Sequence, residues 1–120
     1  MYNIIYYEDD NGKIPILDFL RALPRKNRAK AIWEIDLLKE FGTNLSMPHV
    51  KKMSSYNNLW ELRIKVSSNN YRVFYFHHTN NNFILLHGFH KKSQKTPKRE
   101  IQIAIKRKNT FIERNENHES

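Results

Sequence analysis

The sequence predicts an α+β domain in which helices pack on one face of an antiparallel sheet. Three runs rich in β-branched and aromatic residues follow one another over 59–66, 71–77 and 83–89, separated by turns rich in Ser and Asn. Two helical patterns precede these runs and one follows them. With one further strand at the start, the predicted order is β-α-α-β-β-β-α, which is typical of a two-layer α+β fold.

The first half of the chain predicts one strand and two helices. A β-branched and aromatic run over residues 2–7 predicts the strand. Pro15 can start a helix, and apolar residues then recur at the spacing of one helical face: Ile16, Phe19, Leu20 and Leu23. A second helix is predicted over residues 25–41, with Gly42 as its stop. Its expected apolar stripe is Ala29, Ile32, Trp33, Leu37 and Phe41.

The second half predicts the sheet and a closing helix. Residues 43–58 are expected to form a loop. After it, Trp60 and Leu62 alternate with Glu61 and Arg63, which predicts a strand with the apolar pair toward the core and the charged pair on the open face. Thr96 and Pro97 then resemble the start of a final helix, expected to run to about Glu113.

Length and composition indicate one domain of an intracellular protein. The 120 residues suit a single domain, predicted over 1–114, with a polar tail over 115–120 that we expect to be disordered. The chain has no Cys, which excludes disulfides and thiolate metal sites. Neither a signal peptide nor a membrane-length apolar run is apparent, so a cytoplasmic location is expected.

The positive charge is concentrated in the C-terminal two thirds of the chain. The formal net charge is +9, yet Lys/Arg and Asp/Glu cancel over residues 1–40. Over residues 41–86 the one acid is Glu61, and the cations are Lys51, Lys52, Arg63, Lys65 and Arg72. A field of this sign attracts polyanions, so nucleic acid is the favoured partner and a membrane surface is not.

Several of these residues suit metal-free cleavage of RNA. Such cleavage needs a base for the 2′-OH, cations for the charge on phosphorus and a group that protonates the departing 5′-oxygen. Glu61 can be the base, and Arg63 and Arg72 can be the cations. An Arg among aromatic residues on a central strand is costly unless it is paired or faces a groove. A structural ion pair between Glu61 and these arginines is the competing interpretation.

A basic segment follows the last predicted strand. Lys91, Lys92 and Lys95 lie within five residues, which suits a rim that grips phosphate, although a solvated charge run is the plainer interpretation. Lys91, Lys92 or His90 could complete the catalytic set. His87 and His90 point to opposite faces of a strand and so do not suit one metal ion, and no cofactor is expected.

The order of motifs resembles a known family. The segments LWELR, YRVFY and ILLHGFHKKSQKTP, followed by EIQIA, resemble the RelE/HigB-like toxins of bacterial type II toxin–antitoxin modules, and more narrowly the phage-derived HigB-type branch. The likeness extends over the earlier helices and the loop MPHVKKM to about residue 112. It implies a RelE-like fold and a ribosome-dependent mRNA endonuclease, or mRNA interferase, that inhibits translation.

The resemblance also implies partners and residue roles. The partners are the ribosome, mRNA and a helix-turn-helix, HigA-like antitoxin, through which operator DNA would be met only indirectly. The residues matched to catalysis are Glu61, Arg63, Arg72 and Lys92. Lys91 matches a basic position of the family, and the residues expected to bind RNA are Lys51, Lys52, His90, Lys91, Lys95 and Lys98. Several members carry a catalytic Tyr or His near the C-terminus, whereas this chain has no Tyr after Tyr75. Either Lys95, Lys98 or His90 substitutes for it, or the base lies elsewhere in the chain.

Two other classes of function remain open from the sequence. A non-catalytic RNA- or DNA-binding module of phage origin could use the same basic face. A docking subunit could use that face to meet an acidic protein. Cut mRNA after expression would distinguish the toxin from a binding module, and ribosome binding that salt weakens would count against the docking subunit.

Overall fold

The computed structural model describes residues 2–79 and 81–119, with side chains through Glu116. The helices are α1 (Pro15–Ala22), α2 (Arg25–Phe41), the short 3₁₀ helix η1 (Gly42–Asn44) and α3 (Lys98–Glu119). The strands are β1 (Asn3–Tyr6), β2 (Val50–Lys52), β3 (Trp60–Val66), β4 (Asn69–His78) and β5 (Asn82–Lys91). This α+β arrangement confirms the predicted fold class.

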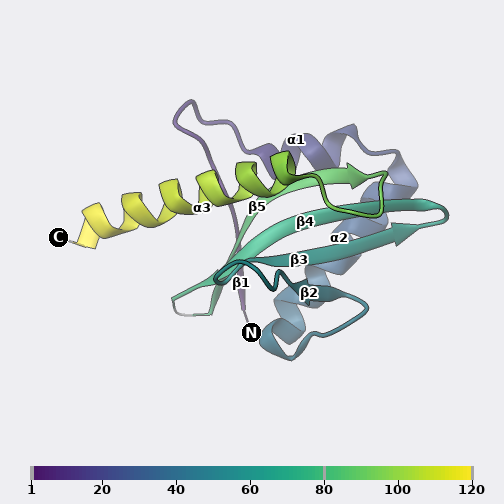
Figure 1. Cartoon of the computed structure of the whole chain (residues 1–120), viewed down its shortest axis with the longest axis horizontal. Coiled ribbons are helices and arrows are strands. Elements are labelled where there is room, and N and C mark those ends of the chain that lie inside the picture. Colours follow the sequence, from purple (N-terminus) through teal and green to yellow (C-terminus); the bar gives the residue numbers. More distant parts are fainter. Residues whose placement is uncertain (1, 80, 120) are drawn as a thin grey trace.

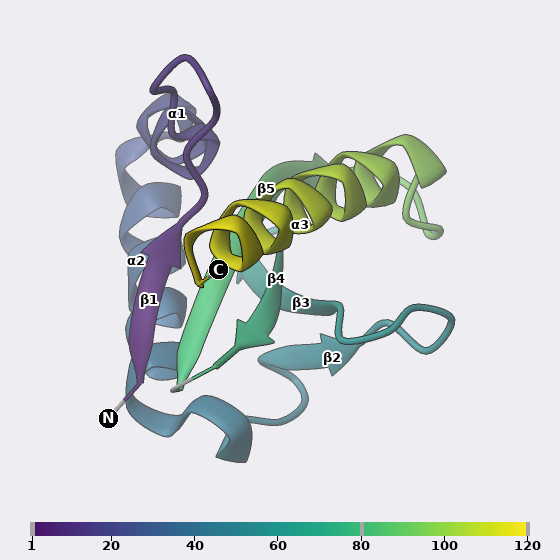
Figure 2. The same ribbon diagram turned by 90° about the vertical axis from the view of Figure 1, so that its left-hand side faces the viewer.

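The five strands form one sheet in the order β1-β5-β4-β3-β2 (Figure 1). β3, β4 and β5 pair antiparallel, as the alternating pattern predicted. β2, which was not predicted, pairs antiparallel with β3, and β1 pairs parallel with β5. In the side view, α1 and α2 lie on one side of the sheet and α3 lies on the other (Figure 2). The last helix therefore covers part of the sheet face that we predicted to be open to solvent.

Alternation along the central strands builds a core on each side of the sheet. Leu62, Val73 and Leu85 point toward α1 and α2, and Phe74 and Leu86 point toward α3. The apolar stripe of α3 packs on the second cluster through Ile101 and Ala104. β4 and β5 are apolar on both faces, so each face needs a covering layer. This requirement explains why α3 lies opposite the first two helices.

Two details of the first half differ from the prediction. Val50–Lys52 forms an edge strand inside the segment expected to be a loop. The stripe proposed for α2 is wrong, because Ile32 is 44% exposed and Trp33 is 48% exposed. The buried face of this helix instead consists of Asn27, Ala31, Glu34, Ile35 and Leu38.

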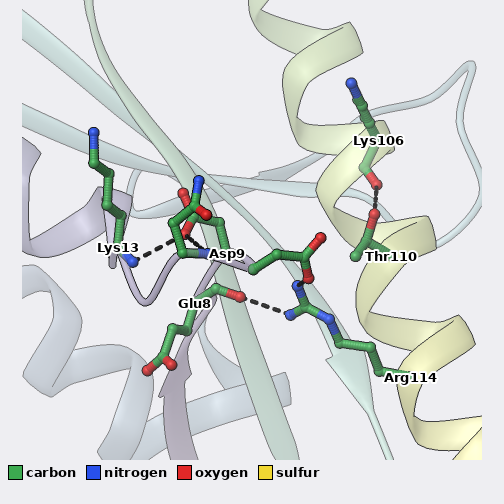
Figure 3. A network of polar contacts seen from close by, with 8 residues as sticks. Glu8, Asp9, Lys13, Lys106, Thr110 and Arg114 are labelled. Carbon is green, nitrogen blue, oxygen red and sulfur yellow. Dashed lines mark hydrogen bonds and ion pairs between the residues drawn. The ribbon is translucent and has the colours of Figure 1, made fainter.

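α3 extends past the expected end near Glu113 and reaches Glu119. Polar contacts hold it to the N-terminal loop (Figure 3). The carboxylate of Asp9 accepts hydrogen bonds from the backbone N–H groups of Asn11 and Lys13, which folds the loop. The guanidinium of Arg114 donates to the carbonyl of Glu8 at 2.6 Å and also pairs with Asp10. The tail that we predicted to be disordered covers residues 115–120, and its last residue lies outside those that the structure describes.

Candidate nucleic-acid interface

The strand pattern brings Glu61, Arg63 and Arg72 together on the α3 side of the sheet. Glu61 and Arg63 are two apart on β3 and share a face. The register of β3 and β4 pairs Arg63 with Arg72, so all three side chains lie on that face. Glu61 is 6% exposed and Arg72 is 4% exposed, so the centre of the face is far more enclosed than the sequence suggested.

The carboxylate of Glu61 lies between the two guanidinium groups. Its Oε1 is 3.7 Å from Nε of Arg72 and 3.9 Å from Nε of Arg63. Both separations exceed a direct hydrogen bond. Arg72 donates through one terminal nitrogen to the carbonyl of Tyr71, but its buried Nε has no hydrogen-bond partner among the residues that the structure describes. The guanidinium therefore keeps unused donor capacity.

Two lysines complete the cluster. Lys51 on β2 pairs in register with Glu61. Lys91 ends β5, and its ammonium donates to the carbonyl of Gln94 at 2.8 Å. Burial lowers the pKa of Lys91, and the charges of Arg72, Arg63 and Lys51 lower it further while Glu61 opposes them. We call Lys51, Glu61, Arg63, Arg72 and Lys91 the central cluster.

The electrostatics of the central cluster favour an anion. Burial lowers the pKa of Arg72, Glu61 opposes this shift and Arg63 adds to it. Among these five side chains one carboxylate faces four cations, so positive charge is incompletely neutralised. A phosphate would supply the missing negative charge, and planar guanidinium groups match its geometry.

A basic hollow lies beside the arginines. It has a volume of about 370 Å³, and its lining includes Arg63, Lys65 and Arg72 from the sheet. Lys30, Glu34 and His49 line its other side. Glu34 is buried, with its carboxylate 3.0 Å from Nδ1 of His49 and 3.6 Å from Lys30. Arg63 can therefore be reached from this hollow, whereas Arg72 stays buried.

The remaining predicted residues fall into two groups. Lys92, Lys95 and Lys98 are exposed between the end of β5 and the start of α3, on the rim of the same region. Lys91 and Lys92 also line a shallow hollow with Asn70. In contrast, Lys52 and His90 belong to the opposite face of the sheet: Lys52 pairs with Trp60, and the ring of His90 lies 4.7 Å from that of Tyr71.

Sequence patterns indicated only that His87 does not share a metal ion with His90, and they did not reveal the polar group around the side chain of His87. Nε2 of His87 lies 3.2 Å from the carboxylate of Glu100, and Nδ1 lies 3.2 Å from a guanidinium nitrogen of Arg107. Burial lowers the pKa of His87, which favours the neutral ring that accepts from Arg107 and donates to Glu100. Glu100 and Arg107 are seven apart on α3, a helical spacing that would have revealed the pair.

Neither metal chemistry nor a membrane span is indicated by the described residues. Among the side chains described over 2–79 and 81–116, no three His, Asp or Glu residues converge to form a metal-binding group. No helix in that part of the chain is long and apolar enough to cross a bilayer.

The fold and the central cluster define a RelE-like α+β protein with a basic sheet face. A family model described as phage-derived protein Gp49-like (DUF891) matches residues 18–109. The chain therefore belongs to the Gp49-like family, which is part of the RelE/HigB-like toxin family. The resemblance seen in the sequence is confirmed at this level, while the narrower HigB branch stays a prediction. The chain matches no curated protein.

Proposed function

We propose that this protein is the toxin of a type II toxin–antitoxin module and a metal-independent endoribonuclease that cuts mRNA on the ribosome. One observation carries the proposal: the buried guanidinium of Arg72, with an unused Nε donor, lies 3.7 Å from the carboxylate of Glu61 among further cations. Family membership supports the toxin class. The cytoplasm, where ribosomes and mRNA meet, is the proposed location.

The proposed reaction uses the central cluster and its rim. Arg72 and Arg63 bind the scissile phosphate, while Glu61 accepts the proton of the 2′-OH. The 2′-oxygen then bonds to phosphorus, and the bond from phosphorus to the 5′-oxygen breaks. The products are a 2′,3′-cyclic phosphate and a 5′-hydroxyl, and Lys91 or Lys92 gives the proton to the departing oxygen. The lowered pKa of Lys91 suits this transfer.

The proposed partners follow from the same assignment. The exposed lysines 92, 95 and 98 form a rim for the phosphates of mRNA and ribosomal RNA. A helix-turn-helix antitoxin neutralises the toxin and alone contacts operator DNA. Free RNA is expected to bind weakly and to be cut poorly, because the ribosome would position the strand.

A non-catalytic nucleic-acid-binding module is the second candidate. The burial of Glu61 favours it, because a carboxylate 6% exposed between two arginines is better placed to orient them than to meet a 2′-OH. Such a module would bind RNA through the same cations and leave its backbone intact.

Expression in a host without antitoxin tests both candidates. The wild type is expected to stop growth and to create new mRNA ends inside translated regions. Arg72→Ala is expected to abolish both effects while retaining the fold, and Arg72→Lys is expected to retain little activity, because an ammonium lacks the planar fork. Lys39→Ala removes an exposed cation on α2 and serves as the charge control. Unchanged mRNA ends with the wild type would favour the binding module, and growth arrest that survives Arg72→Ala would refute the site.

A further inference from the structure

We propose that a second pocket, on the face of the sheet opposite the central cluster, binds a single nucleotide through its base. The pocket has a volume of about 220 Å³ and lies where α2 ends and η1 begins. Tyr75 and His77 on β4 line it, and they alternate with Phe74 and Phe76, which face α3. The two sites are therefore separated by the sheet itself.

Aromatic rings form the walls of this base pocket. The side chains of Trp60, Tyr75, His77 and Phe83 all line it. The ring of His77 stacks on Phe83 with centroids 4.8 Å apart, and Tyr75 meets Phe83 edge-on at 5.6 Å. Aromatic side chains of this kind bind nucleobases by stacking, whichever base is present. The volume admits one flat ring system.

One residue of the lining also carries a buried polar atom without a partner. Nε2 of His77 is buried and has no hydrogen-bond partner among the side chains described over 2–79 and 81–116 or the described backbone. Asn58 fixes the backbone of His77 on both sides, with Nδ2 donating to its carbonyl and Oδ1 accepting from its N–H. A buried ring nitrogen without a partner is costly, so a ligand with a hydrogen-bonding edge would be favoured.

A cation lies at the border of the base pocket. Lys52 is exposed, lines the pocket and places its ammonium 6.0 Å from the centroid of the Trp60 ring. Lys51, its neighbour on β2, points to the other face and joins the central cluster. A ligand that combines a flat ring, a polar edge and a negative charge matches the walls, His77 and Lys52 together. A nucleotide has all three features.

An apolar side chain from a protein partner matches this pocket less well. It could fill the space between the rings, but it would leave Nε2 of His77 without a partner and the charge of Lys52 without a counterion. The nucleotide can come from a free pool or from an RNA strand, and the chemistry that recognises the base and phosphate is shared.

Tryptophan fluorescence tests the base pocket directly. Trp33→Phe leaves Trp60 as the one tryptophan of the 120-residue chain, so its emission reports on this pocket. Titration uses the four nucleoside monophosphates, a short single-stranded RNA, inorganic phosphate and N-acetylphenylalaninamide. We expect saturable quenching by at least one nucleotide and none by phosphate alone. Tighter binding of the RNA than of its mononucleotides would identify a strand as the source, and equal binding would identify the free nucleotide.

Paired variants separate the two faces. In the Trp33→Phe background, Lys52→Ala and His77→Leu are each expected to weaken nucleotide binding about tenfold, as the loss of one good polar contact predicts. Lys51→Ala changes the neighbouring lysine and is expected to leave this binding unchanged. Circular dichroism checks that each variant is folded, and Asn57→Ala provides a second, milder change in the lining.

Three outcomes would overturn the inference. They are the absence of quenching at millimolar nucleotide, equal weakening by Lys51→Ala and Lys52→Ala, and saturable binding of N-acetylphenylalaninamide with no response to nucleotides. The last outcome would assign the pocket to an apolar side chain of a protein. None of these results depends on RNA cleavage, so the base pocket and the proposed nuclease can fail separately.

Discussion

Replacing Glu61 by Gln tests whether the central cluster is an electrostatic unit. The substitution preserves the side-chain volume and removes the negative charge that lies 3.7 Å from Arg72 and 3.9 Å from Arg63. Breaking a buried ion pair costs about 3–5 kcal/mol because it leaves a buried charge uncompensated. The separations exceed hydrogen-bond distance, so we expect a loss near the lower end, about 3 kcal/mol in the free energy of unfolding.

Urea unfolding followed by circular dichroism measures this loss at neutral pH and low salt. The double variant Glu61→Gln/Arg72→Met removes both buried charges, and it is expected to recover most of the stability, as in other proteins whose buried pairs were replaced by apolar groups. Arg72→Met alone completes the cycle and separates the pairwise energy from the packing change.

Inorganic phosphate adds a second readout. Without Glu61, four cations remain in the central cluster, so phosphate should raise the stability of Glu61→Gln more than that of the wild type. A Glu61→Gln loss below about 0.5 kcal/mol, which is the range of ordinary surface changes, would refute the reasoning. So would a double variant that is no more stable than Glu61→Gln.

Three further predictions concern the scaffold. Gly88→Ala would place a Cβ 2.5 Å from the ring of Phe19, and we expect a loss of about 1–3 kcal/mol on urea unfolding, recovered in part by adding Phe19→Leu. Burial lowers the pKa of His87 below its ordinary 6.5, so the unfolded chain binds a proton more readily. The stability contributed by the neutral ring is therefore present above pH 6.5 and lost as the pH falls through the folded-state pKa, and His87→Gln should flatten this decline. Arg114→Ala should speed amide hydrogen exchange in the loop over residues 8–13 while exchange in β4 stays unchanged.

Each of these has a contradicting result. Full stability of Gly88→Ala would show that α1 can move away from β5. A wild-type stability curve between pH 5 and pH 7 that runs parallel to that of His87→Gln would exclude His87 as the titrating group. Unchanged loop exchange in Arg114→Ala would show that Asp9 alone holds the loop, because its carboxylate already accepts two backbone hydrogen bonds.

The sheet was predictable because its strands carry strong local signals. The alternation of apolar and charged residues over 59–66 and the turns on either side of 71–77 identify strands from the local sequence alone, without knowledge of what packs against them. β2 was missed because two of its three residues are the lysines 51 and 52. Charged side chains on a short edge strand discourage pairing with other chains, and they also hide the strand from pattern analysis.

The buried face of α2 was not predictable from apolar spacing. Asn27 is buried because its amide donates to the hydroxyl of Tyr71 at 2.7 Å, and Glu34 is buried because it pairs with His49. These partners are distant in sequence, so only the tertiary structure reveals them. Trp33 was assigned to the core for its apolar character, yet it lies at the surface with the ammonium of Lys30 4.1 Å from its ring.

The composition of the central cluster was only partly predictable. Period two placed Glu61 and Arg63 on one face, the aromatic neighbours of Arg72 singled out that residue, and the basic segment after the last strand indicated Lys91. The pairing of Arg63 with Arg72 depends on strand register, which a two-residue period does not determine. The register and the antiparallel direction of the strands also decide that Lys51 joins the central cluster, while Lys52 and His90 lie on the other face of the sheet.

The parallel pairing of β1 with β5 affects when the protein can fold. Asn3 and Asn82 are hydrogen-bonded partners, although they are 79 positions apart in the sequence. During synthesis, β1 emerges from the ribosome long before its partner exists, and such long-range closure is intrinsically slow. Lys91, at the end of β5, is made at the same late stage. A nascent chain therefore carries neither a complete sheet nor a complete central cluster until residue 91 of its 120 residues has been translated.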